Sequence, residues 1–380
     1  GNSLYDLYAY NFFDASTITL DATGNWWGTT DPAEIAANIV DQQENATYGP
    51  VVDFRDYLDG FPGSPVVVNT LLGEFSTNTT LVTGTTYEVL GNITVPSGVT
   101  LTIEAGVTLN FDGGTNSLLQ VDGGLVVQGT AVSPVVFTSG QAVRAANDWQ
   151  GIYVSSTATQ AEFDYVEVHY AERGIEFAAN ALTDNTASCV TFCVRNSLIE
   201  NNRYGLYLTG ASPWIEANTI QNSTYDGIWL ATSSPEIRDN TLQNNGSNYA
   251  GIRVGNASNP MVTGNVITGQ RYGLVIYPAN RSAANNPAPV INNNGLYGNS
   301  SYDLYAYNYF DAPNIMLDAT GNWWGTISPA EIAANIYDQQ ENVTYGPVVD
   351  FHDYLDGFPG SPVVVNTLLG EFSTNTTLVT

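Results

Sequence analysis

Residues 205–208 read Gly-Leu-Tyr-Leu, and the same pattern returns as Gly227-Ile-Trp-Leu230, Gly251-Ile-Arg-Val254 and Gly273-Leu-Val-Ile276. Two apolar residues enclose one residue of any kind in each run, an alternation typical of a β-strand with one buried face. An Asn followed two residues later by a large apolar residue also recurs, at 196, 218, 240, 265, 294 and 322. Short strands that return every 22–29 residues predict the coils of a parallel β-solenoid.

Stacked coils would align equivalent residues about 4.8 Å apart. One inward ladder is predicted at Leu206, Ile228, Ile252, Leu274 and Leu304. A second inward ladder is predicted at Cys193, Ile215, Ile237, Val262 and Ile291, each three residues before its Asn. The Asn residues themselves are expected at a tight turn, where their side chains can bond neighbouring coils. A β-sandwich array, the main alternative, would not explain ladders that keep one register.

A much longer repeat encloses these coils. Residues 1–83 return at an offset of 297 as residues 298–380, with 73 identical positions and 10 changes. The chain is therefore expected to be a window on a tandem array. We predict that residues 1–63 end one module, that residues 64–360 form a complete module, and that residues 361–380 begin the next.

Several stretches resemble the right-handed parallel β-helix repeat family, which is found in many secreted and surface proteins. The stretches Gly91–Phe111 and Leu125–Phe137 resemble opening coils, and Trp149-Gln-Gly-Ile152 follows in the same style. The motif Gly-Asn-Trp-Trp-Gly, at 24–28 and 321–325, resembles a closing coil. The likeness covers nearly the whole module and implies this fold, which carries lyases, adhesins and passive stalks alike.

Each closing motif precedes a helix signal. Asp31-Pro-Ala-Glu34 and Ser328-Pro-Ala-Glu331 combine an N-cap, Pro at N1 and Glu at N3. Ile35 and Ile39, like Ile332 and Ile336, would share one helical face. The predicted fold is all-β: a right-handed parallel β-helix in tandem modules, each with a short capping α-helix over the exposed strand edges.

Composition excludes several classes of function. The chain holds 37 acidic residues, nine Arg and no Lys, and its net charge of −28 disfavours binding to nucleic acid. No apolar run approaches the roughly 20 residues of a membrane span. Cys189 and Cys193 are too few for a disulfide scaffold. In one extended strand they would lie about 13 Å apart, so we expect free buried thiols unless a turn brings them together.

An enzyme is not expected. Lys is absent, and Arg55 becomes His352 in the second copy, which is unusual for a catalytic base. No paired-carboxylate signature of a hydrolase is apparent. His169 is interpreted as a solvated strand residue. No cofactor is predicted apart from Ca²⁺, for which the oxygen ligands at the module junction are candidates: Asp53, Asp56, Asp59, Asp350, Asp353 and Asp356.

Contact with other molecules is the more plausible role. The outward residue of each run is often aromatic, which predicts a contact surface for sugar rings or a neighbouring chain: Tyr207, Trp229, Tyr305 and its equivalent Tyr8. The alternative is that aromatic residues simply favour strands. Ten sequons are glycosylation candidates: Asn45, Asn78, Asn92, Asn222, Asn245, Asn256, Asn280, Asn299, Asn342 and Asn375.

The sequence thus favours a structural protein at the cell exterior, built of end-to-end β-helix modules that form a stiff acidic filament, sheath or stalk. Its expected partners are copies of itself and possible glycans, not nucleic acid. Two alternatives stay open. One is a glycan-binding adhesin that uses the aromatic surface, and the other is a polysaccharide lyase or hydrolase.

Overall fold

A computed structural model describes residues 5–13, 15, 18–30, 32–41, 48–54, 57–64, 69–111, 117–178 and 191–363. The chain divides into two compact units, residues 1–207 and residues 208–380. Their border falls inside the predicted module 64–360, so neither end of that module is a border between units. Residues 364–380, most of the predicted third segment, lie outside the described part.

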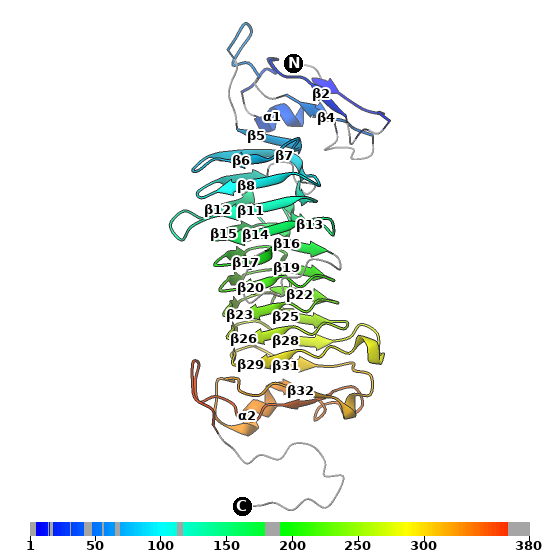
Figure 1. Cartoon of the computed structure of the whole chain (residues 1–380), viewed down its shortest axis with the longest axis vertical. Coiled ribbons are helices and arrows are strands. Elements are labelled where there is room, and N and C mark those ends of the chain that lie inside the picture. The colour runs from blue at the N-terminus through cyan, green and yellow to red at the C-terminus, as the bar shows by residue number, and fades with distance from the viewer. Residues whose placement is uncertain are drawn as a thin grey trace, which may run out of the picture. The chain divides into compact units, whose positions relative to one another are not determined.

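The first unit begins with the end of a module and continues with coils (Figure 1). Its opening elements are β1 (Leu7–Tyr8), β2 (Thr19–Asp21), α1 (Pro32–Ala37), β3 (Ile39–Val40) and β4 (Val51–Asp53). The coils contain β5 (Thr70–Glu74), β6 (Thr79–Leu81), β7 (Thr86–Val95), β8 (Thr100–Glu104), β9 (Thr108–Phe111), β10 (Leu118–Val121), β11 (Gly124–Gln128), β12 (Val135–Ser139), β13 (Trp149–Val154), β14 (Gln160–Asp164), β15 (Val166–His169), β16 (Ala171–Ala178), β17 (Phe192–Arg195), β18 (Leu198–Glu200) and β19 (Tyr204–Thr209), the last of which crosses the border.

The second unit contains further coils and the closing elements of the module. Its strands and helices are β20 (Trp214–Glu216), β21 (Thr219–Gln221), β22 (Ile228–Ala231), β23 (Glu236–Arg238), β24 (Thr241–Gln243), β25 (Ala250–Gly255), β26 (Met261–Thr263), β27 (Val266–Thr268), β28 (Tyr272–Tyr277), the 3-10 helix η3 (Ala283–Asn285), β29 (Val290–Asn292), β30 (Gly295–Leu296), β31 (Tyr302–Ala306), the 3-10 helix η4 (Ala312–Asn314), β32 (Met316–Asp318), α2 (Pro329–Ala334), β33 (Ile336–Tyr337) and β34 (Val348–Asp350).

Within each unit the strands stack in parallel, and each coil contributes three of them. In the first unit β8, β11 and β14 form one face, β9, β12 and β15 a second, and β7, β10 and β13 a third. In the second unit the same three-sided arrangement begins with β20, β21 and β22. The predicted parallel β-solenoid is confirmed.

The first inward ladder is confirmed in the second unit. Ile228, Ile252, Leu274 and Leu304 pair in register along one face, and all four are fully buried. The second ladder is confirmed from Ile215 to Ile291, through Ile237 and Val262. Aligned aliphatic side chains form the core here because alternate residues of every strand point inward.

The second ladder is wrong at its first member. Val194, not Cys193, pairs with the buried Phe163, while Cys193 pairs with the outward-facing Glu162. Cys193 is nevertheless fully buried and is disulfide-bonded, so the expectation of a free thiol is also wrong. The only other cysteine, Cys189, lies outside the described residues. A one-residue slip moves a side chain to the opposite face of a strand, which is why Cys193 does not belong to the inward ladder.

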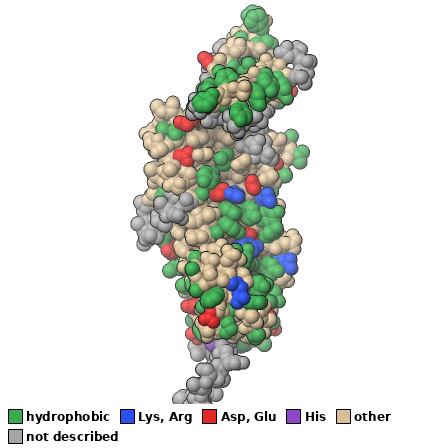
Figure 2. All heavy atoms as spheres, turned by 90° about the vertical axis from the view of Figure 1, so that its right-hand side faces the viewer, with side chains coloured by type: hydrophobic (Ala, Val, Ile, Leu, Met, Phe, Trp, Pro, Cys, Tyr) green, Lys and Arg blue, Asp and Glu red, His purple; other side chains and the backbone are tan. Residues whose placement is uncertain are grey.

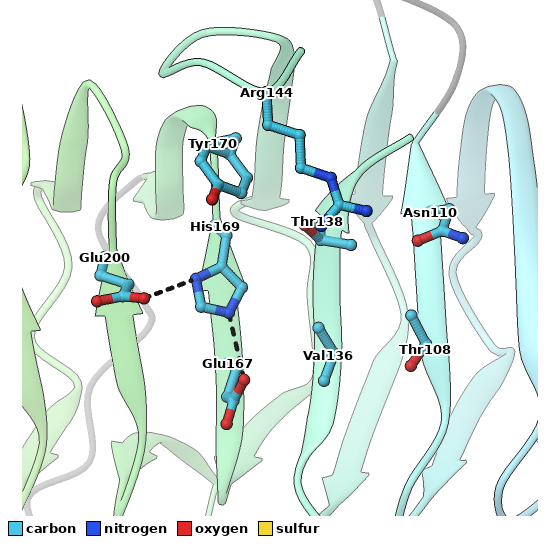
Figure 3. A pocket seen from close by; sticks show the side chains of 9 residues that line it. All are labelled: Thr108, Asn110, Val136, Thr138, Arg144, Glu167, His169, Tyr170 and Glu200. Carbon is cyan, nitrogen blue, oxygen red and sulfur yellow. Dashed lines mark hydrogen bonds and ion pairs between the residues drawn. The ribbon is translucent and has the colours of Figure 1, made fainter. Parts of the chain in front are cut away.

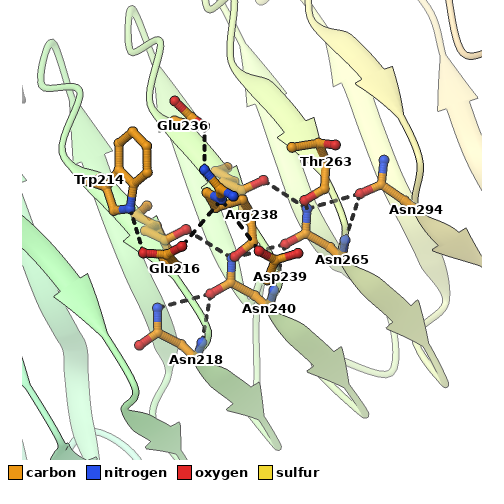
Figure 4. A network of polar contacts seen from close by, with 12 residues as sticks. Trp214, Glu216, Asn218, Glu236, Arg238, Asp239, Asn240, Thr263, Asn265 and Asn294 are labelled. Carbon is orange, nitrogen blue, oxygen red and sulfur yellow. Dashed lines mark hydrogen bonds and ion pairs between the residues drawn. The ribbon is translucent and has the colours of Figure 1, made fainter. Parts of the chain in front are cut away.

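Five asparagines form the predicted hydrogen-bonded stack, which we name the asparagine ladder: Asn218, Asn240, Asn265, Asn294 and Asn322. Figure 4 shows the first four of them. In each of the first four asparagines, the backbone N–H and the side-chain Nδ2 both donate to the Oδ1 of the next asparagine, at 2.9–3.0 Å. Nδ2 also donates to backbone carbonyls, for example from Asn240 to Ile215 at 3.0 Å. The ladder thus provides hydrogen-bond partners for buried backbone groups at the turn, where pairing between strands cannot provide them.

The turn geometry differs from the prediction by one residue. The left-handed residue is the one before each ladder asparagine, as at Ala217, Asp239 and Asn293, and not the ladder asparagine itself. Asn196, predicted to begin the ladder, is itself left-handed, with a φ of 53°. Ser197 beside it is buried, and its hydroxyl accepts from the Val166 N–H at 3.1 Å.

A second polar ladder was not predicted. Asn245, Gln270 and Asn299 each accept a hydrogen bond from the backbone of the preceding coil, and each donates back to a carbonyl of that coil or of an earlier one. The series ends at Asp303, whose carboxylate accepts from Asn299 Nδ2 at 2.8 Å. Asp303 is only 2% exposed. Burial raises the pKa of its carboxyl to about 6, although hydrogen bonds from Asn299 act to lower it.

Asp303→Asn should therefore stabilise the protein at neutral pH by up to roughly 3 kcal/mol. The raised pKa means that the folded state holds its proton more tightly than the unfolded state, whose pKa is near 3.8. The free-energy cost of burying the ionised carboxylate is fully present above pH 6. It falls as the pH is lowered through 6 and disappears below 3.8. Urea unfolding from pH 4 to 8 checks this. A gain in stability that is the same at pH 4 and at pH 8 would contradict the assignment.

The capping helices exist but are shorter than predicted. α1 and α2 have six residues each, so Ile39 and Ile336 lie in the following strands β3 and β33. Ser328 precedes α2 without a side-chain capping bond; Glu331 instead accepts from the Thr326 hydroxyl. Ile35 and Ile332 are fully buried, as expected for the apolar side of a cap.

The segment that precedes residue 64 packs directly onto the first coils that follow it. Ile35, Tyr57 and Leu90 belong to one buried hydrophobic cluster, with Leu72 packed against it. We name this the junction cluster. A methyl group built on Gly73 would meet the Val51 side chain at 3.5 Å, so β4 and β5 also approach closely. The junction within the first unit is therefore a packed core and not a free linker.

Candidate functional site

The predicted contact residues lie on the outward side of their strands. Tyr207, Trp229 and Tyr305 are half-buried, whereas Tyr8 is 62% exposed. The Arg173 guanidinium lies over the Tyr207 ring at 4.1 Å. Figure 2 shows hydrophobic side chains, among which tyrosine is counted, with basic side chains between them. These aromatics are thus partly covered by their own neighbours.

Tyr305 belongs to a larger cluster, which we name the tyrosine patch: Tyr272, Tyr302, Tyr305, Tyr307, Tyr337 and Tyr345. The Tyr305 and Tyr337 rings stack with centroids 4.4 Å apart, and Arg281 lies 4.1 Å from the Tyr345 ring. Burial and the neighbouring phenols raise the pKa of Tyr305 to about 12. The patch is a surface of half-buried aromatic rings, several of them edge-on to one another, and such rings are suited to contact with another molecule.

A polar cleft of about 300 Å³ lies on the outer side of another face, in the first unit (Figure 3). Four neighbouring strands supply its floor, because equivalent outward residues lie in register: Asn110 pairs with Thr138, and Val136 with Glu167. His169 pairs in turn with Glu200. Arg144 reaches in from the loop after β12, and Tyr170 follows β15 directly.

His169 is held between two carboxylates. Its Nε2 lies 3.3 Å from Glu167 Oε2, and its Nδ1 lies 3.6 Å from Glu200 Oε1. The side chain is only 12% exposed, so the interpretation of a solvated histidine is wrong. The backbone carbonyl of His169 accepts from the Trp149 indole at 2.8 Å, and Trp149 stacks on Phe111 in the core. The core therefore holds the cleft floor in position.

Two further polar residues line the cleft. The Thr138 hydroxyl is buried and has no hydrogen-bond partner within the described residues. Arg144 is exposed and pairs with no acidic side chain in the described ranges. Tyr170 has a φ of 65°, which is uncommon for a bulky residue and recurs at functional sites.

Comparison with known families agrees with this architecture. A family model described as a pectate-lyase-like beta helix domain matches residues 73–188, and one described as a right-handed beta helix region matches residues 143–294. The chain is a right-handed parallel β-helix repeat protein. No curated protein and no solved structure matches it. Both matched stretches end before the closing motif at 321–325.

The matches restrict the activity of this β-helix protein only coarsely. The pectate-lyase-like family includes enzymes, and β-helix domains are often extracellular or attached to a surface. No helix in the described ranges is long and apolar enough to cross a membrane. The cleft lies in the region that both models cover in part.

The predicted Ca²⁺ ligands do not converge in the part of the chain that the structure describes. Asp59 and Asp356 each accept a backbone N–H five residues later, from Ser64 and Ser361, at 2.7 Å. Asp350 accepts from His352 at 2.6 Å. Asp56 lies outside the described residues, and Ca²⁺ binding by these six aspartates stays a prediction.

The glycosylation candidates divide by burial. Asn245 is 1% exposed and its Nδ2 donates to the Ile220 carbonyl, so this prediction is wrong for the folded β-helix protein. Asn299 Nδ2 is likewise engaged, with Ile267 and Asp303. Three of the candidates are half-buried or bonded through Oδ1: Asn78, Asn256 and Asn342. Four of the described candidates are exposed: Asn78, Asn92, Asn222 and Asn280. Asn45 and Asn375 lie outside the described residues.

Sequence reasoning missed the cleft almost entirely. Its residues come from positions 108–200, in segments that share no motif, so only their pairing in register brings them together. One signal was available: Glu167 and His169 stand two apart in an alternating run, which places both side chains on the same face of a strand.

Proposed function

We propose that this β-helix protein is a structural protein of the cell exterior, in which tandem modules form a stiff, acidic filament, sheath or stalk. The junction cluster carries the proposal. Ile35 and Tyr57 from the end of one module are fully buried against Leu90 from the start of the next. A shared core between modules transmits bending forces that a flexible linker would absorb.

Three further features support an exterior location and self-association. Cys193 is disulfide-bonded, which is typical of oxidising compartments outside the cytosol. The net charge of −28 favours solubility and repels other polyanions. The tyrosine patch offers clustered, half-buried aromatic rings for lateral contact with a second copy of the chain.

Electron microscopy of native material and of proteins with one, two and three modules tests this function. Each added 297-residue module should lengthen the particle by about 50–60 Å, since roughly 10–13 coils stack about 4.8 Å apart. The angle between successive modules should vary little from particle to particle. Particles that bend freely at the junction, or native material that contains only short monomers, would contradict the proposal.

A further inference from the structure

We propose that the tyrosine patch, together with two arginines beside it, binds the acidic closing face of a second copy of this chain. We define the closing face as the outer side of β32 and β34, where Asp318 and Asp350 stand in register. This inference rests on the lateral self-association proposed above. It deepens that proposal because it assigns the two different surfaces that meet.

Arg271 and Arg281 bring positive charge to the tyrosine patch. Each guanidinium lies over a tyrosine ring of the patch, at 5.0 Å for Arg271 and at 4.1 Å for Arg281. Their hydrogen bonds go to neutral oxygens, such as the bond from Arg281 Nε to the Tyr309 carbonyl at 3.1 Å. Neither arginine pairs with an acidic side chain within the described residues. Both charges are therefore held in place and left for a carboxylate of another molecule.

The closing face has the opposite charge. Arg281 is the last Lys or Arg of the sequence, so no such residue follows it to neutralise the closing elements. Asp318 is exposed, and its carboxylate accepts only from Thr320, at 2.8 and 3.1 Å. Its neighbour Asp350 adds a like charge in register, which is unfavourable in an isolated sheet. A guanidinium from a second copy would offset that repulsion.

Charge favours contact between the two different surfaces over contact between two tyrosine patches. Two patches would place Arg271 and Arg281 of one copy against the same residues of the other, and like charges at short range repel. A patch against a closing face instead joins guanidinium groups to carboxylates, whose charge-assisted hydrogen bonds are strong.

The two surfaces also lie on separate faces of the module. β33, which carries Tyr337 of the patch, pairs with β31, whereas β32 of the closing face packs against β29. A copy that binds through its patch therefore keeps its closing face free for the next copy. A heterologous contact of this kind extends into a lateral array and does not stop at a dimer. Because modules repeat along a rod, a weak contact for each module is sufficient.

Sedimentation velocity of the full chain at physiological salt tests the proposal, because a Debye length of about 8 Å screens the overall repulsion between acidic chains. The parent protein should associate reversibly with a Kd of about 0.1 mM or below. Combining Arg271→Glu with Arg281→Glu should weaken association by about 10-fold or more. Combining Asp21→Arg with Asp318→Arg, which reverses the same position in both copies of the repeat, should have an equal effect.

An equimolar mixture of the two charge-reversed proteins provides the decisive measurement. The acidic patch of one variant then meets the basic closing face of the other, and the unchanged surfaces also match. The mixture should therefore recover association to within about 3-fold of the parent protein. The matched control is Arg238→Gln, because Arg238 lies on β23 and is already paired with acidic side chains. It should leave association unchanged.

Neutral variants keep the test decisive if a charge-reversed protein melts at a lower temperature than the parent protein. They are Arg271→Gln with Arg281→Gln, and Asp21→Asn with Asp318→Asn, each of which should weaken association by about 3-fold.

A parent protein that stays monomeric near 1 mM overturns the proposal. Unchanged association of the arginine variants overturns it too, because the patch is then not used. Unchanged association of the aspartate variants overturns it in favour of contact between two patches, and a mixture that does not recover association also overturns it. Particle length and bending at the junction do not depend on lateral contact, so the end-to-end role and this inference can fail separately.

Discussion

Asn265→Ala should lower the free energy of unfolding by about 3–5 kcal/mol. The Asn265 Oδ1 accepts from both the backbone and the side chain of Asn240, and its Nδ2 donates to the carbonyls of Ile237 and Thr263. Alanine removes these partners at once. The Asn240 N–H is then left buried without an acceptor, in a position that water cannot reach.

Urea unfolding followed by circular dichroism measures this effect. The matched control is Asn248→Ala in the same unit, since Asn248 is exposed and only accepts a surface hydrogen bond from Arg271 at 2.9 Å. That change should cost less than about 0.5 kcal/mol. If both variants lose the same small amount, the ladder contributes little to stability and the backbone ladders alone hold the coils together.

Leu90→Asp should separate the two modules at their junction. Leu90 is 2% exposed within the junction cluster, so an aspartate there would place a charge against Ile35 and Tyr57 without a partner. The cost of such a charge is several kcal/mol, and the cluster can avoid it by opening. We expect proteolytic cleavage between residues 54 and 69 at protease concentrations that leave the parent protein intact.

Val82→Asp is the matched control, because Val82 lies in the same unit and is 53% exposed. It should show the cleavage pattern of the parent protein. In electron micrographs of two-module proteins, Leu90→Asp should broaden the distribution of angles between modules, and Val82→Asp should not. Equal behaviour of the two variants would mean that the junction cluster does not join the modules mechanically.

Much of the fold could be predicted because a solenoid repeats in sequence what it repeats in space. Ile228, Ile252 and Leu274 occupy the same place in their runs, so the buried ladder could be identified before any coordinates. The asparagine ladder followed from the same reasoning from Asn218 onward. The prediction failed at Asn196 and Cys193, where the pattern fits two registers one residue apart, and only the pairing of Phe163 with Val194 decides between them.

The candidate sites were harder to predict. The cleft does not repeat, and the tyrosine patch repeats only in part, as Tyr5, Tyr8, Tyr10 and Tyr48 of the first copy. Tyr305 was predicted as an outward residue, but its neighbours in the tyrosine patch come from β28, β33 and the loops that follow. Tyr337 could not be placed beside it from the sequence, since Tyr337 follows a capping helix and not a coil. His169 was misread for a similar reason. One of its two acidic neighbours, Glu200, lies 31 residues away in the chain.

By itself, the amino-acid sequence determined the solenoid class, the inward ladders, the polar stack and the 297-residue module. These depend on local alternation and on spacing, which survive as periodic patterns along the chain. Only the tertiary structure decided the register of the coil at Val194, the bonded state of Cys193, the packed junction and the cleft. Each of these depends on which residues of neighbouring coils stand in register. Coil lengths vary from one turn to the next, so small differences in loop length, and not any motif, place Glu200 beside His169 and Arg144 above Thr138.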